Sequence, residues 1–76
     1  MDYIERIKIV RKDKKETQAQ TAEVLNLIQQ QYSRYESGKN ELPIRYLVEL
    51  CKHWNISADY ILGLIDTPRE LYKIEN

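Results

Sequence analysis

The stretch Thr17–Gly38 constrains the fold more than any other part of the chain. Thr17 is a good N-cap, because its hydroxyl can accept a hydrogen bond from a backbone N–H that has no partner at a helix start. Ala22 marks the buried side of a helix predicted over about 18–25. Asn26 tolerates the left-handed backbone that a sharp helix exit requires. The first half of the stretch therefore predicts a short helix that ends in a tight turn.

The second half predicts another helix, over about 29–37, which Gly38 terminates. Tyr32 and Tyr35 are spaced to share its inward side with Glu36. This arrangement leaves a polar set pointing outward: Gln29, Gln30, Gln31, Ser33, Arg34 and Ser37. The outward face of this second helix is the chemically most distinctive part of the chain.

Three further helices are predicted around this pair. Ile4, Ile7 and Val10 recur at helical spacing and indicate an amphipathic helix over about 2–14. A strongly apolar helix over about 43–54 starts at Pro43, where the missing N–H costs little. Ser57 could cap a short fifth helix that Gly63 closes. We therefore expect an all-α fold, with one five-helix domain over residues 1–65 and a tail over 66–76 that is short helix, dimer contact or disordered chain.

Composition excludes several classes of protein. With 76 residues and one cysteine, Cys51, the chain can build neither a disulfide framework nor a cysteine zinc site. The early charges argue against a signal peptide, and the longest apolar run is too short to cross a membrane. No cluster of nucleophile, base or metal-ligand residues suggests catalysis, a metal or a cofactor. We expect a cytoplasmic protein that is not an enzyme.

The outward residues of the second helix have the chemistry of base recognition. Glutamine can form a bidentate pair with adenine, arginine can do so with guanine, and serine can contact a base or a phosphate. Gln18, at the start of the preceding helix, carries its amide beside free backbone N–H groups and could contact a phosphate. A helix of this kind suits the DNA major groove. Net charge is zero, with 12 basic and 12 acidic residues, which argues against a general nucleic-acid coat protein.

The chain resembles the Cro/repressor-type helix-turn-helix proteins of the XRE family. The resemblance covers residues 6–63 and its motifs are strong together, although none is strong alone. The residues that carry it are Arg6-Ile7, Val10-Arg11, Thr17-Gln18, Ala22, Leu25, Gln29, Ser33, Tyr35-Glu36, Gly38, Ile56-Ser57 and Asp59-Tyr60-Ile61-Leu62-Gly63. It implies a lambda-repressor-like five-helix domain that reads double-stranded DNA.

The resemblance also implies roles for individual residues. Base contacts are expected from Gln29, Gln30, Ser33 and Arg34. Backbone contacts are expected from Gln18, Gln31, Ser37, Lys39 and Asn40. A buried ion pair between Arg11 and Glu36 is expected to tie the first helix to the recognition helix.

Four positions depart from the family pattern. Asn26 stands in place of the usual turn glycine, and Ile28 in place of the Ser or Thr that usually caps the recognition helix. Thr21 replaces a core leucine, while Tyr32 replaces a smaller aliphatic residue. A larger ring in the third helix could fill space that the second helix vacates. We expect the fold to persist with a slightly altered helix angle.

These features together predict a prokaryotic or phage transcriptional regulator, of the repressor type, that binds an operator as a homodimer. One recognition helix reads only a few base pairs, so two copies about 34 Å apart would supply useful specificity. The candidates for a dimer contact are apolar residues of the fifth helix and the tail: Ile61, Leu64, Ile65, Leu71 and Ile74.

Other interpretations remain open. The glutamine run could be an ordinary solvated helix face, and the basic block Arg6–Lys15 is better interpreted as solvated surface than as a DNA patch. Lys14 and Lys15 also complement the dipole at the end of the first helix. From another functional class, a protein-interaction module could keep this fold, as in an antitoxin that masks a toxin or an anti-repressor.

Overall fold

The computed structural model describes residues 2–72, and within that range every regular element is helical. The predicted all-α fold is confirmed, and each predicted helix boundary lies within one or two residues of the observed one. The five helices are α1 (Tyr3–Asp13), α2 (Gln18–Val24), α3 (Gln29–Glu36), α4 (Ile44–Trp54) and α5 (Ala58–Ile61).

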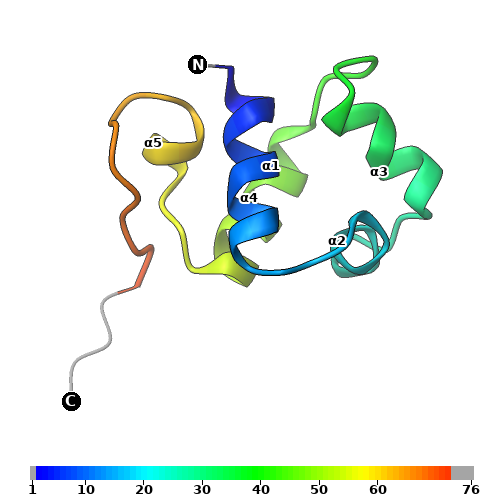
Figure 1. The fold of residues 1–76 in the computed structure, drawn as a ribbon, viewed down its shortest axis with the longest axis horizontal. Helices are drawn as coiled ribbons and strands as arrows, with labels where there is room; N and C mark the ends of the chain where they lie inside the picture. The colour runs from blue at the N-terminus through cyan, green and yellow to red at the C-terminus, as the bar shows by residue number, and fades with distance from the viewer. Residues whose placement is uncertain (1, 73–76) are drawn as a thin grey trace.

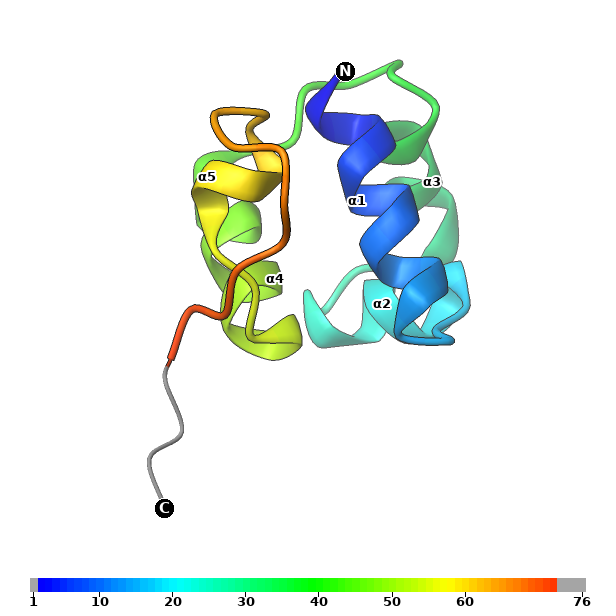
Figure 2. The same ribbon diagram turned by 60° about the vertical axis from the view of Figure 1, so that its left-hand side comes forward.

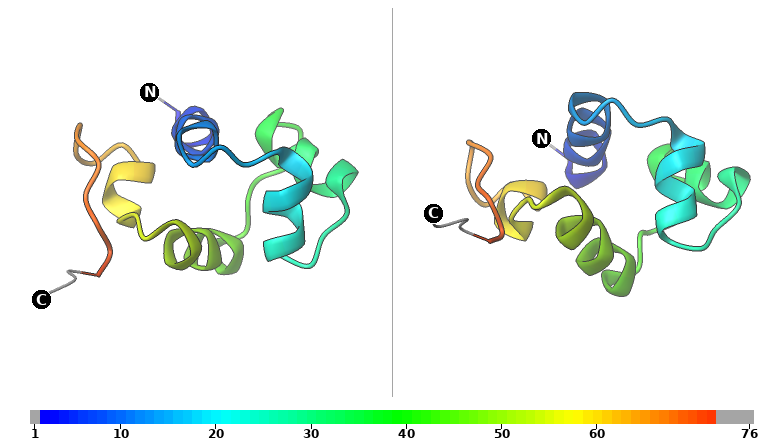
Figure 3. Two further views of the ribbon diagram at one scale, coloured as in Figure 1. Left: turned by 60° about the horizontal axis from the view of Figure 1, so that its bottom comes forward. Right: turned by 90° about the horizontal axis from the view of Figure 1, so that it is seen from below.

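α1 and α4 lie in the middle of the molecule and join the α2–α3 pair at one end to α5 at the other (Figure 1). Figures 1 and 3 show α2 and α3 at one end of the molecule, α5 and the segment after it at the other, and α1 and α4 between them. α1 contacts both α3 and α5, while α4 contacts both α2 and α5. The helix pair that carries the distinctive polar face is therefore braced by α1 and α4.

One continuous apolar core holds these helices together. Its fully buried members come from separate helices and include Ile7, Tyr32, Leu50 and Ile61. Burial of an aliphatic side chain such as Ile7, Leu50 or Ile61 contributes about 1.5–3 kcal/mol, so each of these three residues matters to folding. Ile61 was predicted to be an exposed dimer contact, and that prediction was wrong. Its side chain is 1% exposed, because α5 turns it inward against α1.

The ends of α2 and α3 follow the sequence prediction closely. Thr17 Oγ1 accepts from Gln20 N–H at 3.1 Å, and Gln20 Oε1 accepts from Thr17 N–H at 2.8 Å. This reciprocal pair satisfies two N–H groups that the helix itself cannot. Asn26 has φ 57° and Gly38 has φ 81°, so both adopt the left-handed backbone expected after a helix.

The start of α5 differs from the prediction. Ser57 occupies the N-cap position, but its hydroxyl makes no capping hydrogen bond to the helix. The hydroxyl instead donates to the carboxylate of Asp59, which also pairs with Arg69. These bonds attach the segment after α5 to the helix start.

Residues 66–72 form no helix and run back along the molecule. Figure 2 shows this segment passing α5 toward the C-terminal end of α4. Backbone bonds hold it there, from Ser57 N–H to the Arg69 carbonyl (2.7 Å) and from Leu71 N–H to the Asn55 carbonyl (3.4 Å). Asn55 Oδ1 also accepts from the N–H of Tyr72 at 2.8 Å. The segment is thus part of the folded domain as far as it is described.

Arg6 is a buried residue of α1, although the sequence placed it in a block of solvated surface. Its Nη1 donates to the carbonyl oxygens of Tyr60 and Ile65, each at 3.1 Å, and its guanidinium lies 4.3 Å from the centroid of the Tyr60 ring. These acceptors lie 54 and 59 residues further along the chain, at the end of α5 and in the segment after it, so nothing near Arg6 in sequence indicated them. Arg6 satisfies them and fixes α5 against α1.

Candidate functional site

α3 presents a polar stripe on the side opposite its buried residues. Gln30, Ser33, Arg34 and Ser37 recur at i, i+3, i+4 and i+7, which places them on one face of the helix. Tyr32, on the opposite side, is 0% exposed. Burial of Tyr32 and Glu36 therefore determines which side of α3 faces outward.

Glu36 anchors the orientation of α3 through bonds to two other helices. Its Oε2 accepts from Arg11 Nε at 2.7 Å, and its Oε1 accepts from Arg11 Nη2 and Gln18 Nε2, each at 3.1 Å. The hydroxyl of Tyr32 also donates to Oε2. Arg11 and Glu36 are both buried, and their forked geometry ties α1 to α3.

The charge state of this pair follows from its contacts. Burial by itself raises the pKa of Glu36, but the hydrogen bonds from Arg11, Tyr32 and Gln18 outweigh it and hold the pKa below its ordinary value. The hydrogen bond to Glu36 raises the pKa of Arg11. Burial, aided by the bond to Glu36, raises the pKa of the Tyr32 hydroxyl, which stays a donor at neutral pH. The pair is therefore fully ionised under ordinary conditions.

Glu16, in the loop between α1 and α2, is half-buried and forms a second connection between helices. Its Oε1 accepts from the Thr21 hydroxyl at 2.8 Å and from the Trp54 indole N–H at 3.1 Å, and its Oε2 lies 2.6 Å from His53 Nε2. Burial raises the pKa of Glu16, yet these hydrogen bonds bring it below the ordinary value. Its backbone carbonyl accepts from Arg11 Nη1 at 2.8 Å. The two glutamates thus connect α1, α2, α3 and α4.

Two departures from the family pattern supply donors to this arrangement. Thr21 and Tyr32 are both fully buried, and each hydroxyl donates to one of the two glutamates. A buried hydroxyl without a partner would be costly, so the pairing explains how both residues fit the core. The sequence offered no signal for the bond between Thr21 and Glu16.

The start of α3 lacks a side-chain cap, as the isoleucine at that position predicts. Ile28 has the extended backbone of an N-cap residue, φ −76° and ψ 157°, and its side chain is 62% exposed. Gln31 Oε1 accepts from the Ile28 N–H at 3.3 Å, which supplies half of a capping box. An isoleucine cannot supply the other half.

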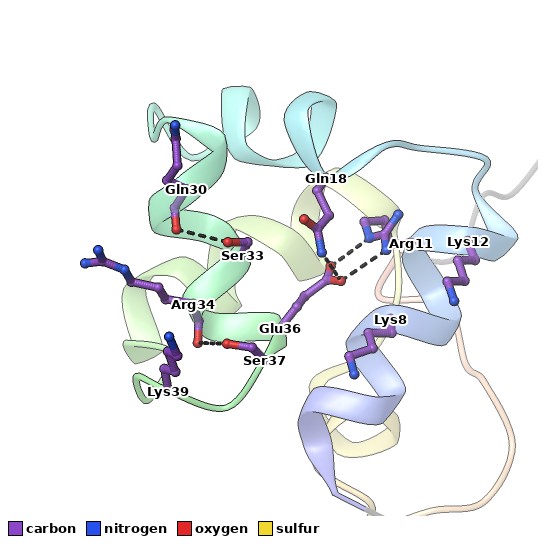
Figure 4. A pocket seen from close by; sticks show the side chains of 10 residues that line it. All are labelled: Lys8, Arg11, Lys12, Gln18, Gln30, Ser33, Arg34, Glu36, Ser37 and Lys39. Atoms are coloured by element: carbon purple, nitrogen blue, oxygen red, sulfur yellow. Dashed lines mark hydrogen bonds and ion pairs between the residues drawn. The ribbon is translucent and has the colours of Figure 1, made fainter.

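A cleft of about 670 Å³ lies between α1 and α3, and Figure 4 shows the side chains around it. Six residues predicted to contact DNA line it: Gln18, Gln30, Ser33, Arg34, Ser37 and Lys39. The remaining lining residues are Lys8, Arg11, Lys12 and Glu36. Three other predicted contacts, Gln29, Gln31 and Asn40, are exposed but do not line the cleft.

Lys8 and Lys12 were not among the predicted site residues. They lie four positions apart on α1 and so share one face of that helix, across from α3 in Figure 4. The sequence already indicated that neither lysine belongs to the buried side of α1, because the apolar residues of that helix lie on another side. Only the packing of α1 against α3 shows which neighbouring surface they face.

Gln18 is held beside the cleft by its bond to Glu36. Its amide nitrogen donates one hydrogen to Glu36, and the same nitrogen carries a second hydrogen. The bond to Glu36 holds the side chain beside the cleft in a defined orientation, as Figure 4 shows. A phosphate oxygen there would meet an amide that is already positioned.

Within residues 2–72, no group of three or more His, Cys, Asp or Glu side chains is arranged to hold a metal ion. No helix in this described range has the length and apolar character needed to cross a membrane.

Comparison with known proteins gives two matches of direct value. The helix-turn-helix family model matches residues 7–61, which include all five helices in whole or in part. The uncharacterized HTH-type transcriptional regulator YobD of Bacillus subtilis (strain 168) is 38% identical over 66 residues, which is 87% of this chain. The match spans 59% of the length of that relative. No solved structure matches the chain significantly.

Proposed function

Because the chain belongs to the XRE-type helix-turn-helix family, we propose that it is a transcriptional regulator that binds double-stranded DNA with α3 in the major groove. The observation that carries this proposal is the stripe of Gln30, Ser33, Arg34 and Ser37. It is accessible along α3, while Tyr32 on the opposite side is buried. Polar side chains on an exposed, rigidly braced helix are what base recognition requires.

The residues divide by the part of the duplex that they would contact. Gln29, Gln30, Ser33 and Arg34 would read base edges from α3. The hydroxyls of Ser33 and Ser37 donate to the carbonyls of Gln30 and Arg34. Ser33 could accept from a base amino group as it stands, whereas Ser37 would turn its hydrogen towards the DNA to donate to a phosphate oxygen. Backbone contacts would come from a second set: Gln18, Gln31, Ser37, Lys39 and Asn40.

Selection of bound sites from a random duplex pool tests the proposal. One enriched site is expected, and Arg34→Ala or Gln30→Ala should weaken binding to it by about 1–3 kcal/mol for each interaction with a base that the substitution removes. Lys14→Ala is the control, since Lys14 is an exposed cation that lines neither the cleft between α1 and α3 nor the groove beside α4 and α5. It should leave the selected sequence unchanged.

Two outcomes would refute parts of this proposal. If the wild-type protein binds no duplex at low salt, DNA binding is refuted, and a protein-interaction module such as an antitoxin or anti-repressor becomes the better explanation. If Arg34→Ala and wild type prefer the same sequences with equal discrimination, base reading by α3 is refuted while DNA binding stands.

We further propose that two copies bind one operator through an apolar surface at the other end of the molecule. A groove of about 470 Å³ lies between α4, α5 and the segment after α5. Its walls are almost wholly apolar and consist of Ile44, Leu47, Val48, Cys51, Lys52, Ala58, Leu62, Leu71 and Tyr72. Of the residues predicted for the dimer contact, Leu71 lines this groove. Leu64 is exposed but does not line it, and Ile65 is half-buried. Ile74 lies outside the described residues.

The extent of this apolar surface supports a symmetric contact. Covering the exposed parts of Ile44, Val48, Leu62, Leu71 and Tyr72 on both copies would remove on the order of 1,000 Å² from water, near the lower limit for a specific interface. Such a dimer would be weak in isolation and strengthened by a two-fold operator. A repressor role would follow if the operator overlaps a promoter.

Sedimentation over a range of protein concentrations tests the dimer contact. Val48→Glu should shift the protein to monomer and weaken binding to a two-half-site duplex more than to a single half-site. Ile9→Glu is the matched control, because Ile9 is 44% exposed, compared with 43% for Val48, but lies on α1. Equal effects of the two substitutions would refute the proposed surface.

A further inference from the structure

We propose that Lys8 and Lys12 hold a phosphodiester strand of the duplex in the cleft between α1 and α3. α1 is then a third DNA-contacting helix, beside α3 and the start of α2, and neither the sequence resemblance nor the family match assigns this role to it. This inference rests on the proposed function, and it specifies where the DNA backbone lies once α3 occupies the major groove.

The geometry of the cleft supports a strand rather than a single anion. Lys8 and Lys12 are one helical turn apart, which is about 6 Å along α1. Figure 4 shows them on one side of the cleft, with Ser33, Ser37 and Lys39 on the other. The cationic groups are spread along both sides instead of converging on one point, so they match an extended row of charges.

The charge of the cleft contrasts with the zero net charge of the whole chain. Five of its lining residues are cationic and one, Glu36, is anionic. The Glu36 carboxylate is already paired with Arg11 and bonded to Gln18 and Tyr32. Concentration of positive charge in a concave surface attracts a polyanion and orients it, even on a neutral protein.

The two lysines are available to bind phosphate. Lys8 Nζ lies 3.3 Å from Glu5 Oε1, but this pair is exposed and worth little. Among the described residues, Lys12 enters no ion pair. Lys14 provides a contrast within the same basic block. It lines a different cavity, together with Asp13 and Glu70, on a side of α1 away from the cleft.

The salt dependence of DNA binding tests the inference. Each phosphate contact contributes about 0.9 to the slope of log Kobs against log salt. Lys8→Gln and Lys12→Gln should each lower that slope by about 0.9, which reduces the change in affinity between 50 and 200 mM salt by about 3.5-fold. The double variant should reduce it by about 12-fold. Both lysines should act equally on the selected site and on random duplex, because phosphate carries no sequence information.

Matched controls separate the lysines from general charge effects. Lys14→Gln removes the same charge from the residue that follows α1 and should change the slope by much less. Lys12→Arg retains the charge and should retain the slope. Glu5→Gln should raise affinity slightly, because it releases Lys8. Thermal unfolding by circular dichroism verifies that each variant is folded, and lysine to alanine replacements provide a second set if a glutamine variant is not.

Three results would overturn the inference, and they differ from failure of the proposed function. If wild type binds DNA and the slope of log Kobs against log salt is unchanged in Lys8→Gln and Lys12→Gln, this inference is overturned while the proposed function stands. If the slope falls as much in Lys14→Gln as in Lys8→Gln and Lys12→Gln, this inference is overturned as well. If inorganic phosphate at fixed ionic strength binds to wild type but not to the double variant, and does so without displacing the duplex, the cleft binds free phosphate and not a strand. Absence of wild-type binding to any duplex would instead refute the proposed function and this inference together.

Discussion

Replacement of Glu36 by glutamine should destabilise the protein severely, although the two side chains have nearly the same shape. In the folded protein each carboxylate oxygen of Glu36 accepts two hydrogen bonds. The four donor groups belong to Arg11, Gln18 and Tyr32. A glutamine amide presents one oxygen and one NH₂ group. Whichever way it is oriented, its NH₂ faces one Arg11 donor and one donor that could rearrange to accept, the Tyr32 hydroxyl by rotation or the Gln18 amide by a flip. The guanidinium of Arg11 cannot accept in either orientation. The Arg11 guanidinium then has no counter-charge.

The magnitude follows from the burial of the pair. Removal of one partner of a buried ion pair costs about 3–5 kcal/mol, because the other charge stays in a low-dielectric environment. A chain of this length has a total stability of roughly 4–11 kcal/mol at ordinary values per residue. Glu36→Gln should therefore remove a large share of the stability, and lower Tm by about 15–30 °C for a domain of this size.

Urea unfolding followed by tryptophan fluorescence can measure the loss. Trp54 is the single tryptophan of the chain and is buried, with its indole N–H bonded to Glu16. The double variant Arg11→Met/Glu36→Gln completes a mutant cycle. Without the guanidinium, the introduced glutamine can still accept from Gln18, and no charge is left unpaired. The double variant should lose less than the sum of the single variants, with a coupling energy of about 2 kcal/mol or more.

Two results would show this reasoning to be wrong. A loss below about 0.5 kcal/mol in Glu36→Gln would mean that Arg11 finds water or another acceptor at no cost. Additive losses in the cycle would mean that the two residues stabilise the protein independently, and that the pair does not tie α1 to α3.

Three further perturbations test other parts of the structure. The folded-state pKa of Glu36 lies below its ordinary value of 4.5, so its contribution to stability is fully present above pH 4.5 and is lost as the pH falls through the folded pKa. The urea concentration at the midpoint of unfolding, measured from pH 7 to pH 3, should therefore fall more steeply in wild type than in Glu36→Gln. Ile28→Ser should stabilise the protein by about 0.5–1 kcal/mol, because it adds the missing cap of α3, whereas Thr17→Val should destabilise it by a similar amount through loss of the cap of α2. If both variants melt at the same temperature as wild type, the capping argument is contradicted. Gly38→Ala should cost about 1 kcal/mol from its positive φ alone, since an added Cβ would meet no atom within 4 Å, and a larger loss in chemical denaturation would indicate a steric clash instead.

Local features were predictable because they depend on neighbouring residues. The cap at Thr17, the left-handed turn at Asn26 and the stop at Gly38 involve contacts within a few residues of the chain. The outward face of α3 was likewise readable, since burial of Tyr32 and Glu36 determines it by helical periodicity alone.

Errors arose where residues distant in sequence meet. Arg6 was placed on the surface, because nothing near it in sequence shows that the end of α5 needs its donors. Ile61 was assigned to a dimer contact, because a short apolar run has no strong periodicity that separates an inward residue from an outward one. Both errors concern the same junction between α1 and α5.

The sequence by itself determined the helices, the cap at Thr17 and the polar face of α3, because each follows from short-range periodicity and turn chemistry. Its motifs also carried the resemblance to the family. Only the tertiary structure decided that Lys8 and Lys12 face that polar surface across a cleft, and that Glu16 joins α2 to α4. A helical pattern shows which side of a helix is free, but it does not show what stands opposite. That depends on how helices pack, which is a property of the whole core.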